Sequence, residues 1–72
     1  MKIRKLEFLW KDEDSNTGNC PSLTKAEGDG QPGYIVNGAR IDETMRARIP
    51  HAGAGEGAVW VPANVIERIR GL

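Results

Sequence analysis

The chain has 72 residues, of which ten are lysine or arginine and ten are aspartate or glutamate, so its formal net charge is zero. This length corresponds to one small domain, residues 1–72, and the balanced charge excludes a polybasic binder whose affinity comes from counterion release on nucleic acid. A domain this short buries only about 60% of its unfolded surface. We therefore expect marginal stability, and docking on a protein partner or pairing into a homodimer as ways to bury more.

The first predicted strand runs from Ile3 to Trp10. Its side chains alternate between apolar and other residues, which predicts one apolar face and one mixed face. The apolar face holds Leu6, Phe8 and Trp10, and the mixed face holds Lys5, Glu7 and Leu9. Residues 12–19 are typical of a polar turn, and a short second strand is predicted around Leu23 in residues 21–25. Residues 26–33 carry three glycines and a proline, which favours a loop.

The pair Asn37-Gly38 lies between two apolar stretches and is typical of a two-residue hairpin turn with two positive φ angles. In that register the flanking residues pair across the turn, and four of them share one face. The opposed pairs are Val36 with Ala39 and Tyr34 with Ile41, and the other face carries Ile35 and Arg40.

Asp42 is predicted to cap a short helix with Glu43 in its first turn, and Pro50 ends it. Arg46 and Arg48 lie in its predicted last turn, where they suit the helix dipole. A glycine-rich loop at 51–57, a strand at 58–61 and a closing helix that begins at Pro62 follow. The predicted fold is α+β: a small, mainly antiparallel sheet or half-barrel with a β-hairpin and two short helices, the last at the C-terminus.

No residue set in the sequence predicts catalysis, a cofactor or a metal. Asp12, Asp14 and Asn16 have the spacing that opens a calcium loop, but the sixth and twelfth positions hold Thr17 and Leu23 instead of glycine and glutamate. The string at 28–33 matches G-x-G-x-x-G, yet a strand and not a helix follows it. One cysteine and one histidine, Cys20 and His51, cannot supply four zinc ligands, and nothing in their spacing supports a catalytic pair. We expect a protein that is not an enzyme.

The sequence also predicts where the protein acts. Cys20 is the only cysteine, so no intrachain disulfide can form, which favours a reducing compartment. The longest apolar runs are far shorter than the roughly 20 residues that span a bilayer. The basic N-terminus is not followed by the apolar segment of a signal peptide. We expect a cytoplasmic protein with no membrane contact.

Basic residues gather in two places in the sequence. One cluster holds Arg40, Arg46 and Arg48, and the other holds Lys2, Arg4, Lys5 and Lys11. With Trp10 and Tyr34 nearby they could form a surface that contacts phosphates and bases. Asp42, Glu43 and the acidic run at 12–14 offset their field, so a nucleic-acid-binding module is the alternative interpretation and not the leading one.

Trp10-Lys11, then Ser15, then Gly18-Asn19-Cys20 resembles the signature of the small actinobacterial BldB-like domain family. In that family a Trp-Lys or Trp-Arg pair begins a turn that ends in Gly-Asn-Cys, and a short strand, a hairpin and a final helix follow. The segments 34–36 and 59–62 fall where those later elements would lie, and the similarity covers about residues 6–69. The resemblance implies no catalytic activity and no cofactor. It implies a regulatory accessory protein, developmental or antitoxin-like, that acts with a helix-turn-helix transcription regulator.

The leading hypothesis is therefore a cytoplasmic interaction module that binds such a regulator, or itself, through an exposed part of the sheet. The residues expected at or near that surface fall off the best apolar stripes or end them, and they are Leu9, Trp10, Ile35 and Trp60. A toxin or enzyme subunit whose site is completed by another chain stays open as a third reading. A catalytic neighbour in the genome favours that reading, whereas a helix-turn-helix neighbour favours the first. A mobile-element protein with no assigned role also stays open.

Overall fold

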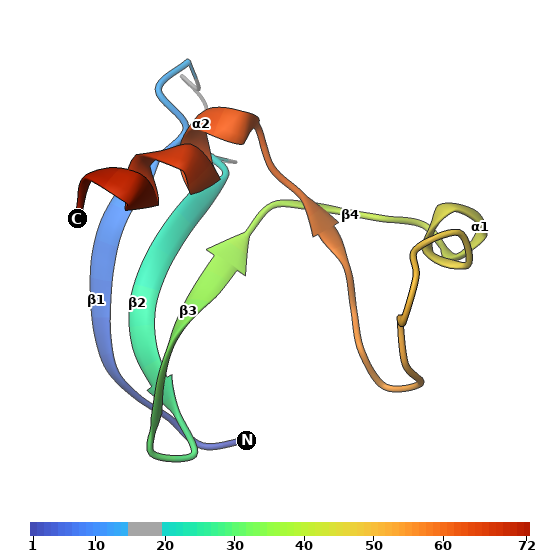
Figure 1. Ribbon diagram of the computed structural model, residues 1–72, viewed down its shortest axis with the longest axis horizontal. Helices are drawn as coiled ribbons and strands as arrows, with labels where there is room; N and C mark the ends of the chain where they lie inside the picture. The colour runs from blue at the N-terminus through green and yellow to red at the C-terminus, as the bar shows by residue number, and fades with distance from the viewer. Residues whose placement is uncertain (15–19) are drawn as a thin grey trace.

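The computed structural model describes residues 1–14 and 20–72 of the chain, and the elements form an α+β fold as the sequence predicts (Figure 1). Three antiparallel strands form the main sheet in the order β1-β2-β3, and two shorter strands form a second sheet. The elements in chain order are β1 (Ile3–Lys11), β2 (Ser22–Gly28), β3 (Gln31–Asn37), β4 (Ala39–Arg40), α1 (Glu43–Arg46), β5 (Val59–Trp60), α2 (Ala63–Glu67) and the 3₁₀ helix η1 (Arg68–Gly71).

The hairpin of the main sheet lies between β2 and β3, and not at Asn37-Gly38. Asp29 and Gly30 have φ angles of 50° and 82°, the two positive values that a type I′ turn requires. The strands on either side pair without a break from Ser22↔Asn37 to Gly28↔Gln31. The prediction of a loop over 26–33 is therefore wrong. The Asp29-Gly30 pair forms the turn. The backbone pairing between β2 and β3 holds both strands together although each contains a glycine.

At Asn37-Gly38 the chain leaves the main sheet instead of turning back. Neither residue has a positive φ, and the predicted pairs do not form, since Val36 faces Leu23 and Ala39 faces Trp60. Gly38 is needed here for space, because a Cβ at this position would lie 2.5 Å from the carbonyl oxygen of Trp60. The glycine that suggested a turn allows the chain just before β4 to lie close to the end of β5.

Strand β1 does not keep the predicted alternation. Its pairing with β2 shifts register between Arg4 and Glu7 and again between Phe8 and Trp10. Phe8 pairs with Thr24 and Trp10 with Leu23, two neighbours on β2, so the two aromatic side chains point to opposite faces of the sheet. The prediction that they share one apolar face is wrong, because the bulge at Leu9 reverses the face that follows it.

The core lies between α2 and the face of the sheet that carries Trp10. Among the described residues, Leu23 and Val65 are buried in this core, and Ala26 is buried on the opposite face of the sheet. The Trp10 indole N–H donates a hydrogen bond to the Val65 carbonyl at 2.7 Å, and the Arg68 guanidinium lies 5.4 Å from the Trp10 ring centroid. These contacts, made by the predicted closing helix, fix the C-terminal segment across one end of the sheet (Figure 1).

Polar side chains complete this attachment at the end of β1. The Asn64 side-chain amide donates to Asp12 Oδ1 at 2.9 Å, and Arg68 donates to the Lys11 carbonyl. Arg68 also donates to Asn64 Oδ1 at 3.0 Å, so both residues are held in one network. Pro62 precedes α2 as its N-cap residue, which agrees with the predicted start of that helix.

Residues 38–61 form an arm that projects from the main sheet (Figure 1). Asp42 caps α1 as predicted, because its carboxylate accepts from the Met45 backbone N–H at 2.8 Å. The helix is shorter than the pattern indicated: it ends at Arg46, and Arg48 lies beyond it. Strand β5 forms where a strand was predicted, but its partner is β4. None of the helices in the described part of the chain is long and apolar enough to cross a membrane.

We predict that Gly30→Ala destabilises the fold by about 1 kcal/mol, because an alanine at a positive φ is strained. Chemical denaturation followed by circular dichroism measures this change. Gly33→Ala is the matched control, since Gly33 lies on β3 with a negative or extended φ and its Cβ would meet only the Ala26 carbonyl at 4.0 Å. If both variants lose the same stability, the positive φ at the turn is not the cause.

Candidate interaction surfaces

One face of the main sheet lies opposite α2 and is not covered by it. The unbroken register of β2 and β3 places Ile35 beside Thr24, and the β1 ladder brings Ile3 and Phe8 to the same face as Ala26. Phe8 is 62% exposed and Ile3 and Ile35 are each 38% exposed, whereas Ala26 lies buried among them. We call Ile3, Phe8, Ala26 and Ile35 the open face.

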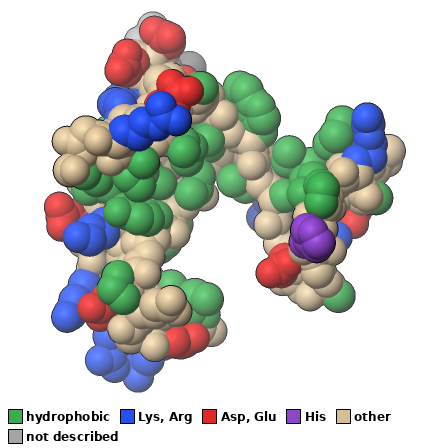
Figure 2. Space-filling view, in the orientation of Figure 1, with side chains coloured by type: hydrophobic (Ala, Val, Ile, Leu, Met, Phe, Trp, Pro, Cys, Tyr) green, Lys and Arg blue, Asp and Glu red, His purple; other side chains and the backbone are tan. Residues whose placement is uncertain are grey.

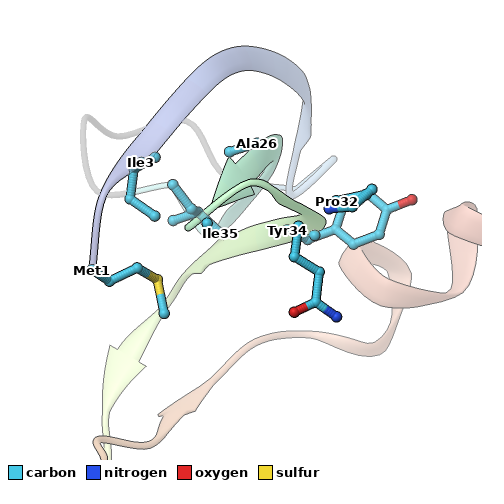
Figure 3. Close-up of a pocket in the computed structure, with 9 residues that line it drawn as sticks. Met1, Ile3, Ala26, Pro32, Tyr34 and Ile35 are labelled. Carbon is cyan, nitrogen blue, oxygen red and sulfur yellow. The ribbon is translucent and has the colours of Figure 1, made fainter.

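The open face continues into a shallow hollow at the hairpin end of the sheet (Figure 3). In that view Met1 and Ile3 line one side and Pro32 and Tyr34 the other, with Ile35 between them. The hollow measures about 240 Å³, enough for one large side chain. An apolar face with a side-chain-sized hollow is the form that a protein contact takes, since buried anchors in pockets dominate binding energy.

The arm is a second surface, separate from the open face. Figure 2 shows the arm and the sheet as two bodies with a deep notch between them, and hydrophobic side chains lie on both. No residue from 38 to 61 is buried. The large apolar side chains exposed on the arm are Met45, Ile49, Val59 and Trp60. Trp60, at 60% exposure, is the largest of them.

Arg46 connects α1 to the glycine-rich loop of the arm. Its guanidinium donates to the backbone carbonyls of Gly53 and Glu56, and it forms a 3.5 Å ion pair with Glu43. Glu56 in turn accepts from the Gly53 N–H at 2.8 Å, so the glycine-rich loop is tied to α1. The Arg46 side chain is only 19% exposed, which makes it a structural residue of the arm.

The residues expected at a partner surface are not brought together. Ile35 lies on the open face, and Trp60 lies on the arm. Trp10 packs under α2 with its N–H bonded, and Leu9 is half-buried at the bulge beside it. Sequence reasoning missed Phe8 because strict alternation places it within the apolar face of the first strand and not at the end of that face. The register shift that separates Phe8 from Trp10 has no plain signal in the sequence.

The three arginines of the nucleic-acid alternative all lie on the arm but do not form a basic surface. Arg46 is engaged inside the arm, while Arg40 and Arg48 are exposed. The arm also carries Asp42, Glu43 and Glu56, so its formal charge is zero. At the other cluster, Lys5 pairs with Glu27 at 3.4 Å.

The candidates for chemistry are spread over the chain. Cys20 is half-buried and precedes β2, and its carbonyl accepts from the Asn37 side chain at 3.2 Å. His51 is exposed on the arm with a positive φ. Among residues 1–14 and 20–72, no group of three or more His, Cys, Asp and Glu side chains could hold a metal ion. The calcium-like spacing and the resemblance signature include residues from 15–19, which lie outside the described part of the chain.

Comparison of the chain with protein-family models, with curated proteins and with solved structures found no match.

Proposed function

We propose that this chain is a small regulatory protein–protein interaction module that acts in the cytoplasm and binds a helix-turn-helix transcription regulator through the open face. The observation that carries the proposal is the open face itself: one side of a three-stranded sheet is packed by α2, and the other exposes Ile3, Phe8 and Ile35 around the buried Ala26. The class of partner comes from the resemblance to the BldB-like family.

Burial of the open face by a partner is favoured by the hydrophobic free energy. Burying one large apolar side chain contributes about 1.5–3 kcal/mol, and Phe8 leaves most of its surface in water in the isolated chain. A partner that covers it together with Ile35 gains more from this face than from any charged patch. An adjacent hollow lined by Met1, Tyr34 and neighbouring residues can take an anchoring side chain from the partner.

The nucleic-acid alternative has less support. Single-stranded nucleic-acid binding needs a positive groove with aromatic platforms, and the acidic residues on the arm balance its arginines. Trp10, the platform expected beside the N-terminal lysines, has its ring under Arg68 and its N–H bonded to Val65.

We predict that Phe8→Thr lowers affinity for the regulator about 10- to 100-fold, because the partner loses the largest apolar contact of the open face. Threonine is a good strand former, so β1 is kept. Tagged wild-type and variant chains are used as baits in lysate of the native source, and the proteins retained are identified by mass spectrometry. The recovered helix-turn-helix protein is then purified and titrated by calorimetry.

Ile66→Gln is the matched control. Ile66 is 42% exposed on α2, close to the exposure of Ile35, but it lies on neither the open face nor the arm. We expect this variant to bind as the wild type does. Recovery of no helix-turn-helix protein by the wild-type bait contradicts the proposed partner, and equal binding by Phe8→Thr contradicts the proposed surface.

A further inference from the structure

We infer that the arm, residues 38–61, is a self-association surface that binds the arm of a second copy of this chain. The inference concerns a different surface from the proposed function and does not rest on it. The chain exposes 5802 Å², whereas a compact monomer of 7.9 kDa exposes about 4,400 Å².

The excess, about 1,400 Å², is more than the roughly 800 Å² that one partner buries in a standard interface. The shape agrees with this, because the radius of gyration is 13.4 Å against about 11 Å for a compact chain of 72 residues. The excess is therefore large enough for one standard dimer contact.

The arm lacks the buried side chains that join the main sheet to α2. A two-stranded sheet and a single turn of helix are marginal in water without an apolar face to pack. The arm has both elements and no buried residue, and β4 and β5 pair only with each other. Arg46 nevertheless ties α1 to the glycine-rich loop, and Met45 on α1 and Trp60 on β5 are both exposed.

The charges on the arm favour a second copy as the occupant. Arg40 and Arg48 are exposed, as are Asp42 and Glu43, so the arm carries exposed charges of both signs, and these four sum to zero. In a two-fold contact the same patch meets itself, and arginines of one copy can then face carboxylates of the other. The chain as a whole has a formal net charge of zero, so no overall repulsion opposes the pairing.

The test is sedimentation equilibrium of the purified chain. We expect the wild type to have twice the 7.9 kDa chain mass at about 50 µM. Trp60→Thr removes the largest apolar group of the arm and keeps a strand former. It should raise the dimer dissociation constant about 30-fold or more. Met45→Gln, on α1 and away from the β4–β5 ladder, should weaken the dimer in the same direction.

Circular dichroism shows whether each variant keeps the fold, and Ile66→Gln should dimerise as the wild type does. A wild type that is monomeric at this concentration overturns the inference, and so does a folded Trp60→Thr that dimerises normally.

The regulator titration separates the two proposals. If the wild-type chain is monomeric and Phe8→Thr binds the regulator more weakly, the dimer is ruled out and the proposed function stands. If the wild-type chain is monomeric and Trp60→Thr binds the regulator more weakly, the arm binds the regulator instead of a second copy.

Discussion

Replacing Leu23 by alanine is expected to unfold a large fraction of the isolated chain. Leu23 is 2% exposed and lies opposite Trp10 on β1 and Val36 on β3, at the centre of the main sheet under α2. Leucine-to-alanine changes in a core cost about 2–5 kcal/mol, and a domain of this length has a total stability of the order of 5 kcal/mol. The loss is severe because so few side chains are buried.

Urea denaturation followed by far-ultraviolet circular dichroism measures this effect. Leu6→Ala is the matched control: it makes the same chemical change at a leucine of the same sheet that is 65% exposed. We expect the control to stay within about 0.5 kcal/mol of the wild type. Equal stability of the two variants would show that the core is not where the structure places it.

Trp10→Ala is expected to cost about 3 kcal/mol or more of folding stability, mainly through detachment of the C-terminal segment. The indole packs between the sheet and α2, donates its N–H to Val65 and lies beneath Arg68. Trp10→Phe keeps most of the packing and loses the hydrogen bond, which leaves the Val65 carbonyl without that donor. It should therefore cost a smaller amount, about 1–2 kcal/mol.

Thermal and urea denaturation give the two stabilities, and titration with the proposed helix-turn-helix regulator decides the role of the side chain. Trp10 was expected from the sequence to lie at or near the partner surface, whereas the structure gives it a structural role. Folded Trp10→Phe should therefore bind the regulator as the wild type does. If Trp10→Phe folds with unchanged stability but binds the regulator more weakly, Trp10 lies in the interface.

Local signals in the sequence predicted several elements of the fold. The Asp42 cap, the position of α2 after Pro62 and the first strand follow from residues whose partners are near in sequence, and each is confirmed. The hairpin was misplaced because Asn37-Gly38 and Asp29-Gly30 carry the same turn chemistry. The choice between them was made by the β2–β3 ladder and by the close approach at Gly38, which are tertiary contacts.

The candidate surfaces were predicted only in part, for the same reason. Ile35 and Trp60 were selected as residues outside the apolar stripes, and both are exposed, but they lie on separate surfaces. The bulge that moves Phe8 to the open face depends on how β1 pairs with β2. The arm could not be predicted, because β4 pairs with a strand that follows it by about 20 residues.

The central claim is that the open face is covered by a protein partner and the arm by a second copy. Sedimentation velocity of the wild-type chain, alone and mixed with the purified helix-turn-helix regulator, tests both parts directly. We expect a dimer of the chain alone and a larger complex that contains two copies of the chain with bound regulator. A monomer that gains no mass when the regulator is added would contradict it.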